Sequence, residues 1–140
     1  AALFTLLPSD NTIFMPNSNN LFKVSGGGPS TCLSYEFFNT AIVTFGVSTN
    51  NYNKQVGFGN KNIVPGTFVY GFNLIANGTF NLYYNGSVNL NVPNLPYSPN
   101  DIFTLALDGT YAMYYQNGIL IAMYHRIPEV TSVQFYCSIN

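Results

Sequence analysis

Charged side chains are scarce in this chain of 140 residues. Four are Lys or Arg and five are Asp or Glu, which gives a formal net charge of −1 at pH 7. Four scattered cations cannot form the basic clusters that nucleic acids or acidic lipid surfaces require, so both partners are excluded. Solubility must come from neutral amides and hydroxyls. This suits a domain that is oligomeric, glycosylated or part of a larger assembly.

Long hydrophobic runs are also missing. No apolar stretch approaches the ~18 residues that span a bilayer, so we expect no membrane insertion. The apolar segment Ala1–Leu7 has no basic residue and soon meets Pro8. It is therefore interpreted as a strand of the mature protein and not as a signal peptide.

There are only two cysteines, Cys32 and Cys137, and they lie too far apart for a zinc or redox motif. They are either two buried free thiols or one disulfide that ties an early strand to the last one. A disulfide closing a loop of about 100 residues is worth about 4–5 kcal/mol in the chain-entropy description. It would imply an oxidising compartment.

Residues for catalysis and for metal or cofactor binding are sparse. Glu36 and Glu129 lie far apart in the sequence, which does not favour the paired carboxylates of glycoside hydrolysis. Asp101 and Asp108 stand at predicted strand ends, where we expect them to cap turns. His125 is the sole histidine and no serine occupies a G-x-S-x-G elbow. We therefore predict no enzyme activity, no bound metal and no cofactor.

What the chain does contain is 20 Asn and 23 Tyr plus Phe, with hydrophobic residues alternating at period two. Such alternation is typical of half-buried strands, and windows suited to a helix are nearly absent. The alternating segments are Ala41–Val47, Phe68–Ile75, Thr79–Tyr84, Ile102–Leu107, Tyr111–Gln116, Ile119–Tyr124 and Ser132–Ile139.

Turn signals separate these segments. Four dipeptides favour the two positive φ angles of a type I′ hairpin turn: Asn77-Gly78, Asn85-Gly86, Asp108-Gly109 and Asn117-Gly118. Longer connections are expected at Ser48–Asn62, which is rich in Asn and Gly, and at the proline-rich Val92–Asn100. About ten strands result, enough for an all-β, two-sheet antiparallel sandwich. We expect an N-terminal arm or first strand over residues 1–17 and a single sandwich domain over 18–140.

Residues 100–110 (NDIFTLALDGT) and 114–120 (YYQNGIL) resemble the recurrent hairpin of concanavalin A-like lectin/glucanase sandwiches, of the kind seen in laminin-G-like and SPRY-like modules. Segments upstream, from Asn20–Gly27 onward, follow in the order of such modules. Asn100 stands where the pattern usually has Gly. The resemblance implies a jelly-roll sandwich displayed at a surface, and it does not imply catalysis. The E-x-D-x-x-E string of the family's glucanases is absent from this sequence.

With catalysis and charged partners set aside, binding of an uncharged ligand is the function that remains. Tyr and Asn suit sugar binding, because aromatic rings stack on the C–H surfaces of sugars and amides form hydrogen bonds with their hydroxyls. If Ala112 and Tyr114 point into the core, then their neighbours point outward. The candidate ligand-binding residues are Tyr111, Met113, Tyr115, Tyr83, Asn81, Tyr52 and Tyr97. The first three with Tyr83 would form an exposed row, while Tyr52 and Tyr97 would stand on the rim.

The exposed row has two interpretations. One is a glycan-binding or receptor-attachment module of a viral, phage or cell-surface assembly, located extracellularly or on the virion. The other is a capsid-decoration or fibre subunit without a ligand, whose aromatic row is covered by copies of itself, a larger coat or the arm Ala1–Met15. Asn77 and Asn85 begin two N-glycosylation sequons at predicted turns.

Overall fold

The computed structural model of the chain describes residues 6–8, 13–17, 20–23, 30–60, 68–89 and 92–140, with side chains described from Ser30 onward. These residues form fourteen antiparallel strands in two main sheets and one small hairpin. Among them, no helix is long and apolar enough to cross a membrane. The prediction of an all-β, two-sheet jelly-roll sandwich is confirmed.

The larger sheet has eight strands. Its order is β1 (Leu6–Pro8), β4 (Ser30–Ser34), β14 (Val133–Ile139), β6 (Lys54–Asn60), β7 (Tyr70–Leu74), β8 (Thr79–Tyr84) and β10 (Leu95–Pro96), with β9 (Ser87–Val88) also paired to β8. The smaller sheet is ordered β13 (Ile119–His125), β12 (Tyr111–Gln116), β11 (Ile102–Leu107) and β5 (Ala41–Gly46). The hairpin pairs β2 (Ile13–Asn17) with β3 (Asn20–Lys23).

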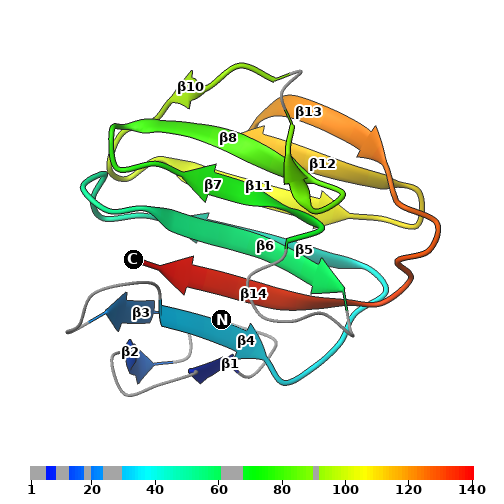
Figure 1. Cartoon of the computed structure of the whole chain (residues 1–140), viewed down its shortest axis with the longest axis horizontal. Coiled ribbons are helices and arrows are strands. Elements are labelled where there is room, and N and C mark those ends of the chain that lie inside the picture. Colours follow the sequence, from blue (N-terminus) through cyan, green and yellow to red (C-terminus); the bar gives the residue numbers. More distant parts are fainter. Residues whose placement is uncertain (1–5, 9–12, 18–19, 24–29, 61–67, 90–91) are drawn as a thin grey trace.

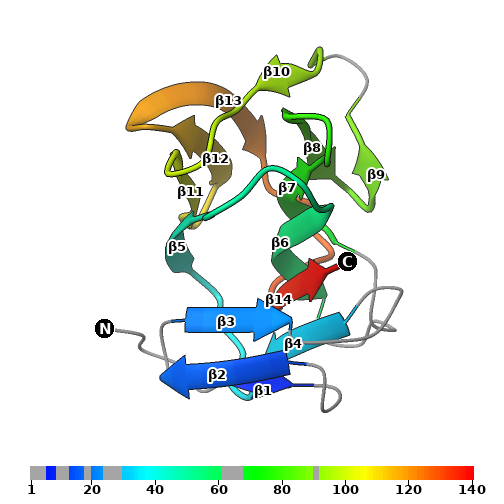
Figure 2. The same ribbon diagram turned by 90° about the vertical axis from the view of Figure 1, so that its left-hand side faces the viewer.

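The two sheets face each other as layers (Figures 1 and 2). Alternation decides which side chains fill the space between them, because successive residues of a strand point to opposite faces. From the larger sheet, Phe72 meets the rings of Phe103 and Tyr114 of the smaller sheet, at centroid distances of 5.2 and 5.6 Å. All three side chains are fully buried. An aromatic core therefore joins the layers.

All four predicted turn dipeptides connect antiparallel neighbours, yet only two adopt the predicted turn type. Both residues of Asn85-Gly86 and of Asn117-Gly118 have positive φ, as type I′ requires. At Asn77-Gly78 only the glycine does, and at Asp108-Gly109 neither residue does. In the last turn, the Asp108 carboxylate accepts hydrogen bonds from the N–H groups of Thr110 and Tyr111, which stabilises a longer loop.

Asn100 has a φ of 73°, in the left-handed region. The position therefore demands the conformation for which the family pattern uses Gly, and Asn is the side chain that tolerates it best.

The prediction of one long connection over Ser48–Asn62 is wrong. Residues 54–60 form β6 in the middle of the larger sheet, between β14 and β7. Gly57 and Gly71 are register partners, and a Cβ on Gly57 would lie 2.1 Å from the Tyr70 carbonyl oxygen. Asn and Gly disfavour strands by propensity, but pairing on both sides and the burial of Phe58 override it.

The described part of the N-terminal arm lies beside the sandwich at one end of the larger sheet (Figures 1 and 2). Its strand β1 pairs with β4. The predicted strand at Ala1–Leu7 is therefore partly found, and residues 1–5 lie outside the described residues. Strand β1 pairs with the larger sheet and β2 pairs with β3, and Figure 2 shows both away from β12.

Candidate functional site

The predicted row on β12 points away from the core. Ala112 and Tyr114 are fully buried, while Tyr111, Met113 and Tyr115 are partly exposed on the outer face of the smaller sheet. The expected orientation of these side chains is therefore confirmed. Their role in ligand binding stays a prediction.

Tyr83 and Asn81 do not join this row, and that part of the prediction is wrong. Both lie on β8 of the larger sheet, with Phe80 and Leu82 pointing into the core between the layers. The outer faces of the two sheets are on opposite sides of the sandwich. Tyr83 and Tyr111 therefore lie on opposite surfaces of the molecule.

Tyr97 is not on a loop rim, which corrects a second expectation. It is 4% exposed, packs against Phe80 and Phe103, and donates a hydrogen bond from its hydroxyl to the Ile75 carbonyl at 3.0 Å. Tyr52 is 60% exposed, in the segment between β5 and β6.

The outer face of the smaller sheet carries an apolar row beside the hydrogen-bonded pair Thr44 and Thr104. One cross-strand row runs through Ile42, Ala106, Met113 and Met123 by direct register pairing. Ile42 is 72% exposed and Met123 is 50% exposed. Exposed apolar surface of this kind marks a contact surface for another macromolecule more readily than a site for a polar ligand.

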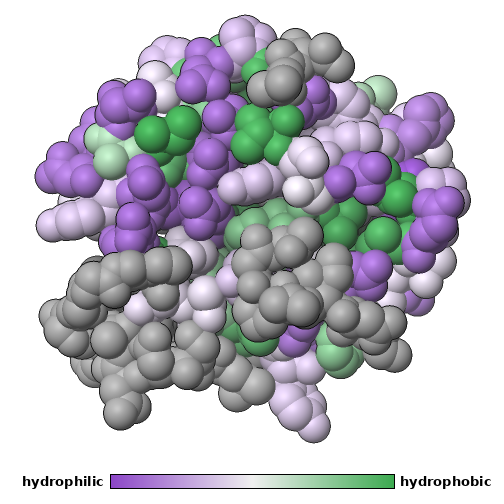
Figure 3. All heavy atoms as spheres, viewed as in Figure 1, coloured by the Kyte–Doolittle hydropathy of each residue, from purple (hydrophilic) through white to green (hydrophobic). Residues whose placement is uncertain are grey.

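The outer face of the larger sheet carries a ladder of amides across neighbouring strands. Gln55 donates to Asn73, Asn73 to Asn81 and Asn81 to Asn94, at 3.1, 2.9 and 3.1 Å. Asn81 is 8% exposed. Figure 3 looks onto this face, where hydrophilic residues gather over part of the surface.

Beside the ladder, an aromatic group packs on the same face. Phe68 stacks on Tyr83 at 5.3 Å, meets Tyr136 edge-on at 4.8 Å, and lies against Gly71. Phe68 and Tyr136 are buried, so the three rings stabilise the sheet and offer little free ring surface. Burial raises the pKa of Tyr83 above its ordinary value.

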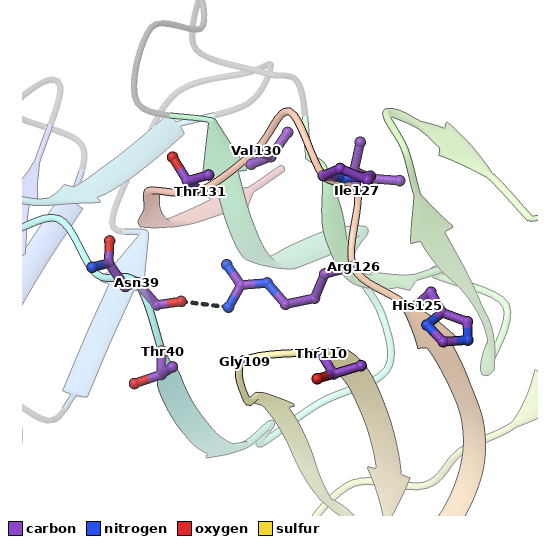
Figure 4. A pocket seen from close by; sticks show the side chains of 10 residues that line it. Asn39, Thr40, Gly109, Thr110, His125, Arg126, Ile127, Val130 and Thr131 are labelled. Carbon is purple, nitrogen blue, oxygen red and sulfur yellow. Dashed lines mark hydrogen bonds between the residues drawn. The ribbon is translucent and has the colours of Figure 1, made fainter.

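A pocket of about 510 Å³ opens at one end of the sandwich (Figure 4). Three connections supply its walls: the segment before β5, the β11–β12 turn and the segment between β13 and β14. Its polar lining comes from Asn39, Thr40, Thr110, His125, Arg126 and Thr131, and its apolar lining includes Ile127, Pro128 and Val130.

Hydrogen bonds fix the segment that carries Arg126 into this pocket. The Tyr84 hydroxyl donates to the His125 carbonyl at 2.6 Å, the Arg126 N–H donates to the Thr110 carbonyl at 2.8 Å, and the Ile127 N–H donates to the Tyr70 hydroxyl at 2.8 Å. Two tyrosines of the larger sheet and the β11–β12 turn of the smaller sheet thus hold this segment in place.

Tyr111 is the one predicted ligand residue beside the pocket. It follows Thr110 in the chain, and its ring lies 4.9 Å from the His125 ring, tilted by 39°. The pocket itself was not predicted. Arg126 and His125 are sequence neighbours, but nothing local in the sequence indicates that Asn39, Thr110 and Thr131 converge on them.

The two aspartates act as turn caps, as predicted, and stand at opposite ends of β11. Asp101 accepts a hydrogen bond from the Ser98 N–H, at 2.9 Å, and also binds the side chains of Gln116 and Asn117. These bonds, the one from Ser98 foremost, hold the pKa of Asp101 below its usual value. The N–H groups of Tyr111 and Thr110 do the same for the pKa of Asp108. In the described part of the chain, no three His, Cys, Asp or Glu side chains come together as a metal-binding group.

Cys32 and Cys137 are direct cross-strand partners on β4 and β14, buried and unbonded. Their side-chain hydrogen bond raises the pKa of Cys137 well above its ordinary value, and burial adds to the effect. The same bond lowers the pKa of Cys32. The structure thus brings the two predicted partners side by side as thiols. Whether they oxidise stays a prediction.

Asn77 and Asn85 both stand exposed on hairpin turns, where the sequons predicted them. The Asn77 side chain accepts hydrogen bonds from the N–H and hydroxyl of Thr79. Their glycosylation stays a prediction.

Solved structures with a similar fold come from several functional classes. The SPRY domain of human HERC1 aligns over 92% of this chain and 84% of its own, at 16% identity and a TM-score of 0.66. The carbohydrate binding module CBM66 from Bacillus subtilis aligns over 97% and 88%, at 13% identity and a TM-score of 0.53. The Bacillus licheniformis beta-glucanase aligns over 94% and 64%, at 14% identity and a TM-score of 0.51.

No protein-family model matches the chain, and no curated protein matches it by sequence. At these low identities, the structural likeness establishes the fold and leaves the function to the site itself. The chain has the concanavalin A-like sandwich fold.

Proposed function

We propose that this domain is a non-catalytic glycan-binding module and that the glycan sits in the end pocket, with Tyr111 at its edge. The observation that carries the proposal is the convergence of hydroxyl, amide and ring groups from three separate connections on one cavity. Its volume of about 510 Å³ falls within the range of small-ligand sites.

The lining suits a sugar. Thr40, Thr110 and Thr131 are exposed, so their hydroxyls can exchange hydrogen bonds with sugar hydroxyls. The half-exposed Tyr111 ring offers a face for the C–H surface of a sugar ring. That a carbohydrate binding module shares the fold supports this choice, although it does not locate the site.

The placement of Asp101 and Asp108 supports a binding role without catalysis. Asp101 and Asp108 are separated by the length of β11, about 20 Å at a rise of ~3.3 Å per residue. Glycosidase carboxylates lie about 5–10 Å apart. Display at an extracellular or virion surface belongs to the proposal as its expected setting.

A glycan array on the purified domain tests the proposal, with Tyr111→Ser as the site variant. We expect the wild type to bind a defined set of glycans and Tyr111→Ser to lose up to about tenfold in affinity. An aromatic stacking contact contributes about 0.5–1.5 kcal/mol, and tenfold corresponds to about 1.4 kcal/mol. Tyr52→Ser is the matched control, because Tyr52 is more exposed and lies beyond the other end of β5. Loss of binding in the Tyr52 variant alone would move the site to that end.

Assembly into an oligomer, coat or fibre is a second candidate function. The exposed apolar row through Ile42 and Met123 on the smaller sheet favours it. The row shares the outer face of the smaller sheet with Tyr111, whereas the rest of the pocket lining comes from connections at the end of the sandwich.

A further inference from the structure

We infer that the end pocket selects sugars that carry a carboxylate, and that Arg126 binds this carboxylate. The inference rests on the proposed glycan-binding function and deepens it by naming the class of sugar. It depends on how the guanidinium of Arg126 is held and on which of its N–H groups are left free.

One side of the guanidinium is fully engaged with the protein. Nη1 donates to the Asn39 carbonyl and, at 2.7 Å, to the Asp108 carbonyl. These two acceptors come from different connections and fix the plane of the group. Figure 4 shows Arg126 reaching into the middle of the pocket lining.

The opposite edge of the guanidinium is available. Within the described residues, neither Nε nor Nη2 of Arg126 donates a hydrogen bond and no carboxylate forms an ion pair with the group. The Asp108 carboxylate is turned to the N–H groups of Tyr111 and Thr110, which lower its pKa, and the nearby charge of Arg126 adds to this lowering of the pKa. The Nε–Nη2 edge matches the two oxygens of a carboxylate as a fork.

Cationic side chains are scarce in this chain, and one of them, Arg126, lies in the end pocket. The 140 residues include four Lys or Arg side chains. Lys54 is occupied by the carbonyls of Thr49 and Tyr52 near the other end of the sandwich. A single oriented cation surrounded by threonines fits one negative charge on an otherwise hydroxylated ligand. A uronic or sialic acid has this composition.

Arg126 also links two connections, so a purely structural role must be separated from ligand binding. The backbone of residues 125–127 is anchored by Tyr84, Thr110 and Tyr70 without using the Arg126 side chain. We therefore expect Arg126→Gln to fold. Arg126→Lys is the second variant, because it keeps the charge and loses the planar fork.

The experiment is a calorimetric or NMR titration of the full chain with glucuronic acid and N-acetylneuraminic acid. Their uncharged methyl esters and glucose serve as matched neutral probes. We expect at least one acid to bind the wild type about tenfold or more tightly than its ester, and this preference to weaken with added salt. Arg126→Gln is expected to bind acid and ester equally, and Arg126→Lys to retain a smaller preference.

Equal affinity of acid and ester for the wild type overturns the inference, as does a preference that survives in Arg126→Gln. If neutral glycans bind on the array while no acid preference exists, the inference fails and the proposed function stands. If neither acids nor neutral glycans bind, both fail. Thermal unfolding of each variant shows whether a lost preference for the acid comes from lost structure. If Arg126→Gln is unfolded, the inference is tested by the smaller acid preference expected of Arg126→Lys and by the salt dependence of acid binding to the wild type.

Discussion

Two glycines allow the larger sheet to pack as it does. Gly57 on β6 and Gly71 on β7 are direct partners, and Phe68 lies over Gly71. A Cβ on Gly57 would meet the Gly71 Cα at 2.5 Å and the Tyr70 carbonyl oxygen at 2.1 Å. Both contacts are with backbone, which cannot turn aside as a flexible side chain would. Gly57 is required here for close approach.

We therefore expect Gly57→Ala to lower the free energy of unfolding by about 1–3 kcal/mol, the usual cost of forcing atoms into a packed site. Gly109→Ala is the control, since nothing lies within 4 Å of the added Cβ, and its effect should stay within about 0.5 kcal/mol. Urea denaturation followed by tyrosine fluorescence measures both. Equal midpoints for the two variants would contradict the argument.

At the scale of elements, the amide ladder ties three strands and a loop together on the outer face of the larger sheet. Asn73 and Asn81 are direct partners on β7 and β8, and Gln55 is the partner of Asn73 on β6. Each interior amide both donates and accepts within the ladder. This is why Asn81, an outward-facing polar residue, can be 8% exposed without an unsatisfied group.

Removing the Asn81 amide should leave the side-chain NH2 of Asn73 without its acceptor in a site that water reaches poorly, while Asn73 keeps the bond from Gln55. We expect Asn81→Ala to cost about 1–3 kcal/mol of stability. Asn94→Ala, at the exposed end of the ladder, should cost less because water replaces its bond. Chemical denaturation of both variants under identical buffer conditions checks the order. A larger loss for the Asn94 variant would show that the ladder does not stabilise the sheet.

At the scale of the whole molecule, the two outer faces differ in kind. The larger sheet presents hydrogen-bonded amides, whereas the smaller sheet presents aliphatic side chains with no charge in the row Ile42, Ala106, Met113 and Met123. A solution surface of this polarity is disfavoured unless another surface covers it. Self-association through the smaller sheet is the consequence we expect.

Light scattering after size exclusion should therefore show a mass that rises with protein concentration, and Ile42→Lys should reduce it to that of a monomer. Tyr35→Lys is the control, because Tyr35 is 70% exposed, close to the 72% of Ile42, and lies outside the smaller sheet. A wild type that stays monomeric at every concentration would remove the second candidate function.

Much of the architecture was predictable because strand alternation and turn chemistry are local. Period two placed Ala112 and Tyr114 on one face, which the family resemblance suggested was the core, and all four Asn-Gly or Asp-Gly signals join antiparallel strands. The turn type at Asp108 was missed because a side-chain cap competes with the positive-φ turn. The strand β6 was missed because Gly57 is needed for the close approach of β7, which is distant in the sequence, and this need has no local signal.

The candidate site depended on longer-range information. Tyr111 was correctly predicted to point outward. Of the other predicted ligand residues, Tyr83 lies on the opposite face of the sandwich and Tyr97 lies in the core. Arg126 meets the carbonyls of Asn39 and Asp108 only after three connections have been brought to one end of the sandwich. The sequence by itself determined most of the strands and which of their side chains are apolar, because both depend mainly on near neighbours, with β6 as the exception. Only the tertiary structure decided which layer each strand joins, and therefore which groups share a surface, because strand pairing depends on contacts between residues far apart in the chain.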